Sequence, residues 1–181
     1  DYRLGFETAK DTAANNPESK PIDDLLAETQ TQFTDLFLNG AADQLGDLDA
    51  LSLYYDFRDL TPAGPKGDEM IRNLARRLVR VDLLSQAGDL LQYQIDSRLK
   101  GVAQAQVATD LALIRIADRN PEAALRVLNQ TRMQNLTPTL DRERRILEAL
   151  ALIDGDRADL AIDLLARVQG RDADLLRVDG Y

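Results

Sequence analysis

Alanines that recur every 37 residues constrain the fold of this chain more than any other feature of its sequence. Two series of three share this period: Ala75, Ala112 and Ala149, and then Ala87, Ala124 and Ala161. Each member of the second series follows its partner in the first by 12 residues. A fixed period of this length indicates one small structural unit that is copied along the chain, each copy burying its apolar face against the next.

Each copy contains two segments with the pattern of a helix. The first segments are expected at 68–82, 103–118 and 141–153, and the second segments at 84–97, 121–133 and 157–168. Bulky apolar pairs follow the second alanine of each copy at the same distance: Leu90-Leu91, Val127-Leu128 and Leu164-Leu165. Alanine at the crossing of two helices lets their backbones approach closely, while larger side chains fill the space beside the crossing.

Turn residues separate the helical segments. Within a copy they are Asn120-Pro121 and Gly155-Asp156, and between copies they are Lys100-Gly101 and Thr137-Pro138. Proline suits the first turn of a helix, and glycine interrupts a helical pattern. The sequence therefore predicts helical hairpins joined by short loops.

The spacing of these residues resembles that of tetratricopeptide repeats, a family of helical hairpins with a period of about 34 residues. The matching sets are Ala75/Ala87/Leu91, Ala112/Ala124/Leu128 and Ala149/Ala161/Leu165. The period here is three residues longer, which we assign to the loops between copies, and Arg115 stands at one position where the family has an aromatic residue. The resemblance covers residues 67–170. It implies an all-α, tetratricopeptide-like solenoid of stacked antiparallel helix pairs, with a groove lined by the first helix of each pair.

The flanks of this region are less regular. Residues 1–20 are expected to form one helix, Tyr2 to Asn15, and a turn, as the half of a further copy. Residues 21–66 are expected to form two helices, Pro21 to Leu38 and Asp47 to Phe57, followed by a loop rich in proline and glycine. Ala50 lies 37 residues before Ala87, so we interpret this pair as a divergent fourth copy. Residues 171–181 read as the start of another helix, which gives about four pairs with partial helices at both ends.

The composition excludes several kinds of chemistry. The chain has no Cys and no His, so it lacks thiol nucleophiles, triads of the Ser-His-Asp kind and the usual zinc ligands. We expect no cofactor, no metal and no enzymatic activity. An enzyme using carboxylates alone needs two acids facing across a cleft, and the sequence shows no such pair.

Charge and hydropathy limit the partners. The net charge is −9, so a phosphate backbone is repelled and no nucleic acid is expected. No uncharged apolar run approaches about 18 residues, so membrane insertion is not expected. The sequence begins Asp1-Tyr2-Arg3-Leu4, without an initiator Met or an apolar leader, which favours a piece of a longer chain. It leaves the compartment open between the cytoplasm and the periplasm or cell envelope.

Arginines at positions Arg72, Arg76 and Arg80 form one stripe on a predicted helix. By the alignment to tetratricopeptide repeats, Arg72 and Arg76 face the groove, where they could bind a carboxylate or an acidic peptide. The alternative is a solvated face that is paired with nearby acids. The peptide-carboxylate clamp of the family is not supported, because Asp110, Glu143 and Leu147 stand where it needs basic or amide side chains.

Further positions are predicted to contact a partner. The same alignment places five residues on the groove side of the later copies: Gln106, Thr109, Leu113, Ile146 and Leu150. Ile146 and Leu150 could equally pack against a following copy. In the N-terminal part, Tyr54 and Phe57 share one helix face and are expected in the core. Tyr55 points elsewhere and is a candidate for an exposed anchor.

Two functions fit this sequence. The first is a non-catalytic scaffold or adaptor segment that binds a partner protein or peptide in a helical-repeat groove. The second is a structural spacer or oligomerisation arm of a large bacterial envelope protein, or of one associated with motility or secretion. The run from Leu53 to Pro62 is similar to helical-repeat regions of such envelope proteins. Apolar faces at the ends of a solenoid could also support self-association.

Overall fold

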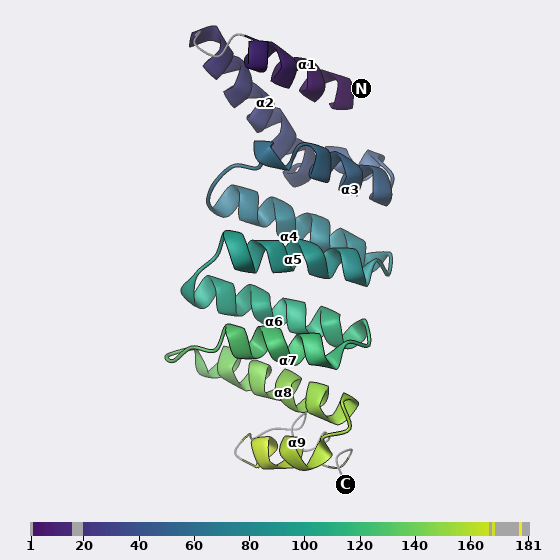
Figure 1. Ribbon diagram of the computed structural model, residues 1–181, viewed down its shortest axis with the longest axis vertical. Helices are drawn as coiled ribbons and strands as arrows, with labels where there is room; N and C mark the ends of the chain where they lie inside the picture. The colour runs from purple at the N-terminus through teal and green to yellow at the C-terminus, as the bar shows by residue number, and fades with distance from the viewer. Residues whose placement is uncertain (1, 16–19, 167, 169–177, 179–181) are drawn as a thin grey trace. The chain divides into compact units, whose positions relative to one another are not determined.

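The chain is all-α in the part that the structure describes. The computed structural model describes residues 2–15, 20–166, 168 and 178 (Figure 1). Within these residues it contains nine α-helices, two short 3-10 helices and no strand. None of these helices combines the length and the apolar character needed to cross a membrane. The chain divides into two compact units, residues 1–81 and residues 82–181.

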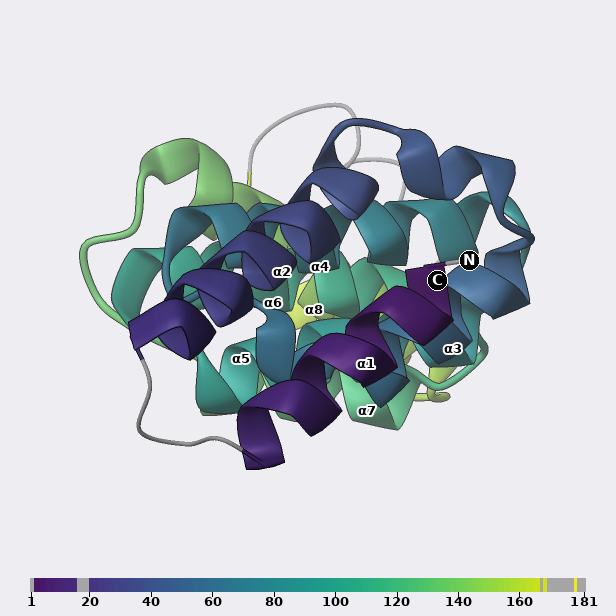
Figure 2. The same cartoon turned by 90° about the horizontal axis from the view of Figure 1, so that it is seen from above.

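The first unit is built around an aromatic cluster. Its elements are α1 (Tyr2–Asn15), α2 (Lys20–Leu38), η1 (Ala41–Gln44), α3 (Asp47–Asp56), η2 (Arg58–Leu60) and α4 (Pro65–Arg80). Helix α2 lies beside α1 (Figure 2) and also packs against α4. Phe6, Phe33, Phe37, Tyr54 and Phe57 are all buried, and their rings meet edge to face. Edge-to-face contact is a favoured geometry for aromatic pairs and stabilises them beyond the area they bury.

The second unit is a succession of helices in chain order. Its elements are α5 (Leu84–Ser97), α6 (Gly101–Ala117), α7 (Pro121–Gln130), α8 (Pro138–Asp154) and α9 (Ala158–Leu165). Figure 1 shows these helices following one another in chain order, and each packs against the next. Helix α6 also packs against α8. Five of the six alanines of the sequence register lie in this unit and Ala75 lies on α4; all six are at most 2% exposed. Their small side chains allow the close approach of helices that the alanine register predicts.

The turns that follow α4, α6 and α8 repeat in detail. One residue of each turn has a left-handed backbone, with φ between 57° and 61°, and these residues are again 37 apart: Asp82, Arg119 and Asp156. The N–H of Asn120 donates to the carbonyl of Arg115 at 2.8 Å, and 37 residues later the N–H of Arg157 donates to the carbonyl of Leu152 at 2.8 Å. A left-handed backbone is uncommon for residues other than glycine. Its recurrence therefore shows that the sequence period is also a period of backbone conformation.

Several helix boundaries differ from those expected. Helix α4 begins at Pro65 and α8 at Pro138, about one turn before the expected starts, because proline occupies the first helical turn in both. Thr137 caps α8 by accepting a hydrogen bond from the N–H of Leu140 at 3.3 Å. Helices α7 and α9 end earlier than expected, at Gln130 and Leu165. The expected helix at 171–181 lies outside the described residues, apart from Val178.

The N-terminal helices pair differently from the later ones. The boundary between the units, at Val81 and Asp82, falls inside the first of the three expected copies. Leu45, which lies 37 residues before Asp82, has an extended backbone (φ −83°, ψ 151°) instead of a left-handed one. Helix α2 packs along α4, whereas it meets α3 through the rings of Phe37 and Tyr54. The first unit thus combines the aromatic cluster with buried alanines, Ala50 and Ala75.

Candidate functional site

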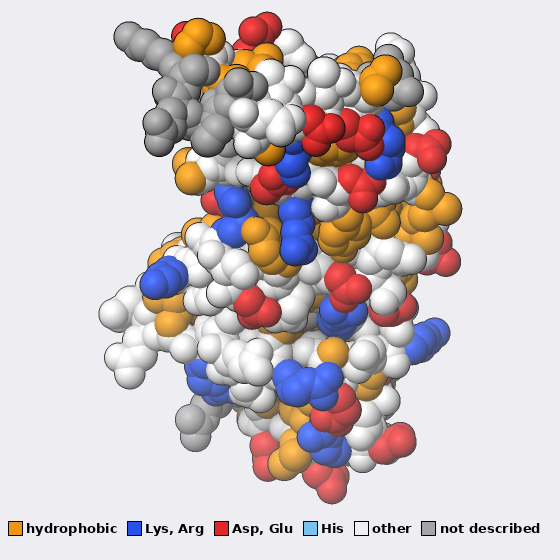
Figure 3. Space-filling view, turned by 45° about the horizontal axis from the view of Figure 1, so that its top comes forward, with side chains coloured by type: hydrophobic (Ala, Val, Ile, Leu, Met, Phe, Trp, Pro, Cys, Tyr) orange, Lys and Arg blue, Asp and Glu red, His pale blue; other side chains and the backbone are white. Residues whose placement is uncertain are grey.

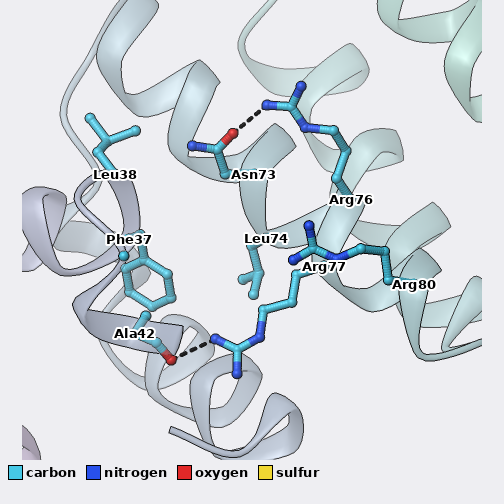
Figure 4. A pocket seen from close by; sticks show the side chains of 9 residues that line it. Phe37, Leu38, Ala42, Asn73, Leu74, Arg76, Arg77 and Arg80 are labelled. Atoms are coloured by element: carbon cyan, nitrogen blue, oxygen red, sulfur yellow. Dashed lines mark hydrogen bonds between the residues drawn. The ribbon is translucent and has the colours of Figure 1, made fainter. Parts of the chain in front are cut away.

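A hollow of about 390 Å³ lies in the first unit, between the end of α2, the start of η1 and the second half of α4 (Figure 4). Its wall is partly apolar and partly cationic; the lining residues are Phe37, Leu38, Gly40, Ala42, Asn73, Leu74, Arg76, Arg77 and Arg80. Gly40 has a left-handed backbone (φ 79°), which turns the chain from α2 into η1 and would be strained with a side chain. The sequence therefore forms this hollow by ending α2 sharply.

Arg77 fixes one side of the hollow. Its guanidinium donates to the carbonyl of Ala42 at 2.6 Å, to the carbonyl of Leu45 and to the carboxylate of Asp47. The side chain is mostly buried. These bonds hold the segment around η1 against α4, so the charge of Arg77 is committed within the unit.

Arg76 and Arg80 form fewer hydrogen bonds and ion pairs within the unit than Arg77. Both are exposed, and within the described part of the chain neither forms an ion pair. Arg76 donates to the side-chain oxygen of Asn73, one turn earlier on the same helix, and Arg80 lies on the same side of the hollow as Arg77 in Figure 4. Three guanidinium groups thus line one hollow, and one of them, that of Arg77, pairs with Asp47. The hollow carries excess positive charge in an acidic protein.

This cationic site is local. In Figure 3, Lys and Arg side chains are interspersed with Asp and Glu side chains on the face shown. A duplex or a single strand of nucleic acid would need a continuous basic surface to follow its phosphates. The hollow has instead the dimensions of a few side chains.

The other residues of the predicted stripe and groove occupy different environments. Arg72 is half-buried and does not line the hollow. On α6, Gln106 is exposed and Leu113 is 54% exposed, while Ile146 and Leu150 on α8 are half-buried. In the first unit Tyr55 is 43% exposed, and its ring lies 5.7 Å from the buried ring of Tyr54. The structure therefore brings Arg76 and Arg80 together at a hollow and leaves Gln106, Leu113 and Tyr55 exposed elsewhere.

Thr109 requires a correction. It was expected to face a partner, but its side chain is 1% exposed. The hydroxyl donates to the carbonyl of Ala105 at 2.8 Å and accepts a hydrogen bond from Arg144 at 3.2 Å. A buried hydroxyl with both roles filled offers nothing to a partner, so we remove Thr109 from the set of candidate contact residues.

Arg144 is a second arginine centre, which the sequence reasoning missed. It is 7% exposed, and within the described residues no carboxylate lies at ion-pair distance from it. Its guanidinium donates to the carbonyls of Ala105 and Leu128, both at 2.8 Å, and to the carbonyl and hydroxyl of Thr131 at 3.3 and 3.0 Å. The carbonyls of Leu128 and Thr131 belong to the end of α7, where a helix leaves its last acceptors unpaired. Arg144 therefore caps α7 and ties it to α6 and α8.

Burial lowers the pKa of the Arg144 guanidinium, and the nearby positive charge of Arg132 lowers it further. Glu148 and Asp141 act in the opposite direction. Arginine stays protonated in proteins, so the charge is retained and the hydrogen bonds offset the cost of its burial. The alanine register could have revealed this residue, since the positions 74 and 37 residues earlier hold Met70 and Val107, both buried.

Among the residues that the structure describes, no three carboxylates are arranged so that they could hold a metal ion. Comparison of the chain with models of known protein families, with curated protein sequences and with solved structures found no match.

Proposed function

We propose that this chain is a tetratricopeptide-like helical-repeat segment that binds a partner protein and has no catalytic role. The repeated left-handed turns, the buried alanines and the packing of α5 to α9 in chain order support the solenoid part of this proposal. Solenoids of this kind bury each hairpin against its neighbours and leave a long surface free for binding.

The hollow on α4 carries the binding part of the proposal. Arg76 and Arg80 keep their charge exposed, without a carboxylate partner in the described part of the chain. Arginine is enriched at protein interfaces because its planar group binds carboxylates through two parallel hydrogen bonds. Gln106 and Leu113 on α6 and Ile146 and Leu150 on α8 are the further surface positions that we assign to partner contact.

The test is affinity capture from an extract of the source organism, with captured proteins identified by mass spectrometry. The wild type is compared with Arg76→Glu/Arg80→Glu. The control is Lys66→Glu/Lys100→Glu, which makes the same change in net charge at two exposed lysines outside the hollow. We expect a protein that the wild type and the control capture and the arginine variant loses. If all three capture the same proteins or none, while circular dichroism shows them folded, the binding proposal fails and a spacer or oligomerisation arm is the better description.

A further inference from the structure

The polar groups that line the hollow are mainly hydrogen-bond donors. Guanidinium groups donate and do not accept. The side-chain oxygen of Asn73 accepts from Arg76, and the amide nitrogen of Asn73 is a further donor. A ligand that satisfies these groups must therefore consist of acceptors and carry negative charge. Carboxylates meet both requirements, and their planar geometry matches the fork of an arginine.

The two exposed arginines also set a spacing. Arg76 and Arg80 are four residues apart on α4, so their side chains leave the helix one turn apart on the same face. Two acidic side chains that are one helical turn apart on another helix have the same separation. Phe37, Leu38 and Leu74 form the wall beside the guanidinium groups (Figure 4), and this wall suits the two methylene groups of a glutamate stem better than the shorter stem of an aspartate.

We infer that the ligand of this hollow is an acidic helix of the partner protein, with two glutamates one turn apart that pair with Arg76 and Arg80. This inference rests on the proposed function and specifies the chemistry of the partner. The net charge of −9 disfavours a polyphosphate, because the long-range field of the chain repels it, whereas two carboxylates within a mixed protein surface act at contact distance.

The experiment measures fluorescence anisotropy of labelled, alanine-based helical peptides of about 17 residues, a length at which such helices form in water. The probe peptide carries two glutamates four residues apart. One matched peptide has glutamine at both positions, and a second has the glutamates two residues apart, which places them on different faces of the helix. A third carries phosphoserine in place of both glutamates. The protein variants are Arg76→Gln/Arg80→Gln and, as the control, Lys66→Gln/Lys100→Gln.

We expect the wild type and the lysine control to bind the probe peptide, and the binding to weaken as salt is raised. The arginine variant should bind it at least about tenfold more weakly, as should the wild type with the glutamine peptide, since charge-assisted hydrogen bonds are lost in both cases. Equal binding of the peptide with glutamates two residues apart would overturn the spacing. Binding of the phosphoserine peptide alone would overturn the assignment to carboxylates.

The outcomes separate this inference from the proposed function. If no peptide binds but capture from the extract still depends on Arg76 and Arg80, then the acidic-helix assignment is wrong and the partner-binding function stands. If the probe peptide binds as expected but the extract yields no protein that depends on these arginines, then the chemistry of the hollow is supported and the partner-binding function fails.

Discussion

The hollow on α4 and the cluster around Arg144 on α8 use the same side chain in opposite ways. Around Arg144, the guanidinium is buried and bonded to backbone and hydroxyl oxygens of α6 and of the end of α7. In the hollow, Arg76 and Arg80 are exposed, and Arg76 donates to the side-chain oxygen of Asn73 on the same helix. An arginine whose guanidinium is buried and bonded to several oxygens inside the fold stabilises it. An arginine whose guanidinium is exposed and makes few hydrogen bonds within the fold can donate to a partner.

Arg77 shows that the difference lies in the surroundings and not in the helix. It is adjacent to Arg76 in the sequence, yet it points to η1 and bonds two carbonyls and Asp47. Neighbouring residues on a helix lie about 100° apart, so one faces the inside of the unit while the other faces solvent. A count of arginines on α4 therefore overstates the charge that is available for binding.

Replacement of Arg144 should produce the largest effect on stability. Arg144→Ala leaves the carbonyls of Leu128 and Thr131 without their partner and opens a cavity, so we expect the free energy of unfolding to fall by roughly 3 kcal/mol. Arg144→Met, which introduces the residue that stands 74 positions earlier, fills the space without a buried charge and should lose about half as much. Urea unfolding followed by circular dichroism measures both.

The control for this comparison is Arg126→Ala, an exposed arginine on α7 in the same unit. Its replacement should change the free energy of unfolding by less than about 0.5 kcal/mol. If Arg144→Ala costs no more than Arg126→Ala, then the buried hydrogen bonds do not stabilise the unit and the contrast with the hollow disappears.

Arg115 and Gly88 provide an intermediate case. A Cβ atom at Gly88 would lie 2.8 Å from the Cζ atom of Arg115, and this arginine pairs with Asp89 at 3.1 Å. The equivalent positions 37 residues later hold Leu125 and Leu152, both buried. Gly88 thus makes room for an arginine where the next copy packs two leucines. We expect Gly88→Leu alone to cost about 2 kcal/mol through overpacking, and Arg115→Leu alone to cost about 1 kcal/mol.

The double variant Gly88→Leu/Arg115→Leu recreates the leucine pair of the next copy. It should recover most of the loss and give a coupling energy of about 1 kcal/mol or more in a double-mutant cycle. Gly88→Leu combined with Arg126→Leu should show no coupling, because the three atoms nearest to a Cβ at Gly88 all belong to Arg115. If the stability losses of Gly88→Leu and Arg115→Leu simply add in the double variant, then the two positions do not interact.

Much of the helical structure could be predicted from the sequence, because the information is local and repeated. The alanine register fixed α4 to α9 to within a few residues, and Tyr54 and Phe57 were correctly expected in the core. The pairing of α2 with α4 could not be predicted in this way. It depends on how five aromatic rings share one interior, and that arrangement leaves no period in the sequence.

The site could be predicted only in part. The spacing of Arg76 and Arg80 placed them on one helix face, but their hollow forms because Gly40 turns the chain back toward α4, which is a non-local event. Thr109 was expected on the surface because the alignment gives the face of a helix and not the depth of each residue. In the structure the Thr109 hydroxyl is buried and accepts a hydrogen bond from Arg144. A polar pair that is buried together cannot be distinguished from two exposed residues by periodicity alone.

The smallest effect on stability should come from the hollow itself. Arg76→Gln/Arg80→Gln removes one hydrogen bond to Asn73 and two charges near the C-terminus of α4, where cations contribute a few tenths of a kcal/mol. We expect the free energy of unfolding to change by less than about 0.5 kcal/mol, as for the control Lys66→Gln/Lys100→Gln. A tenfold loss of peptide binding corresponds to about 1.4 kcal/mol of binding free energy. This loss of binding free energy would exceed the change in the free energy of unfolding. It would therefore show that Arg76 and Arg80 act in binding and not in stabilising the fold. A destabilisation above about 1 kcal/mol would instead show that these arginines support the fold, as Arg144 does.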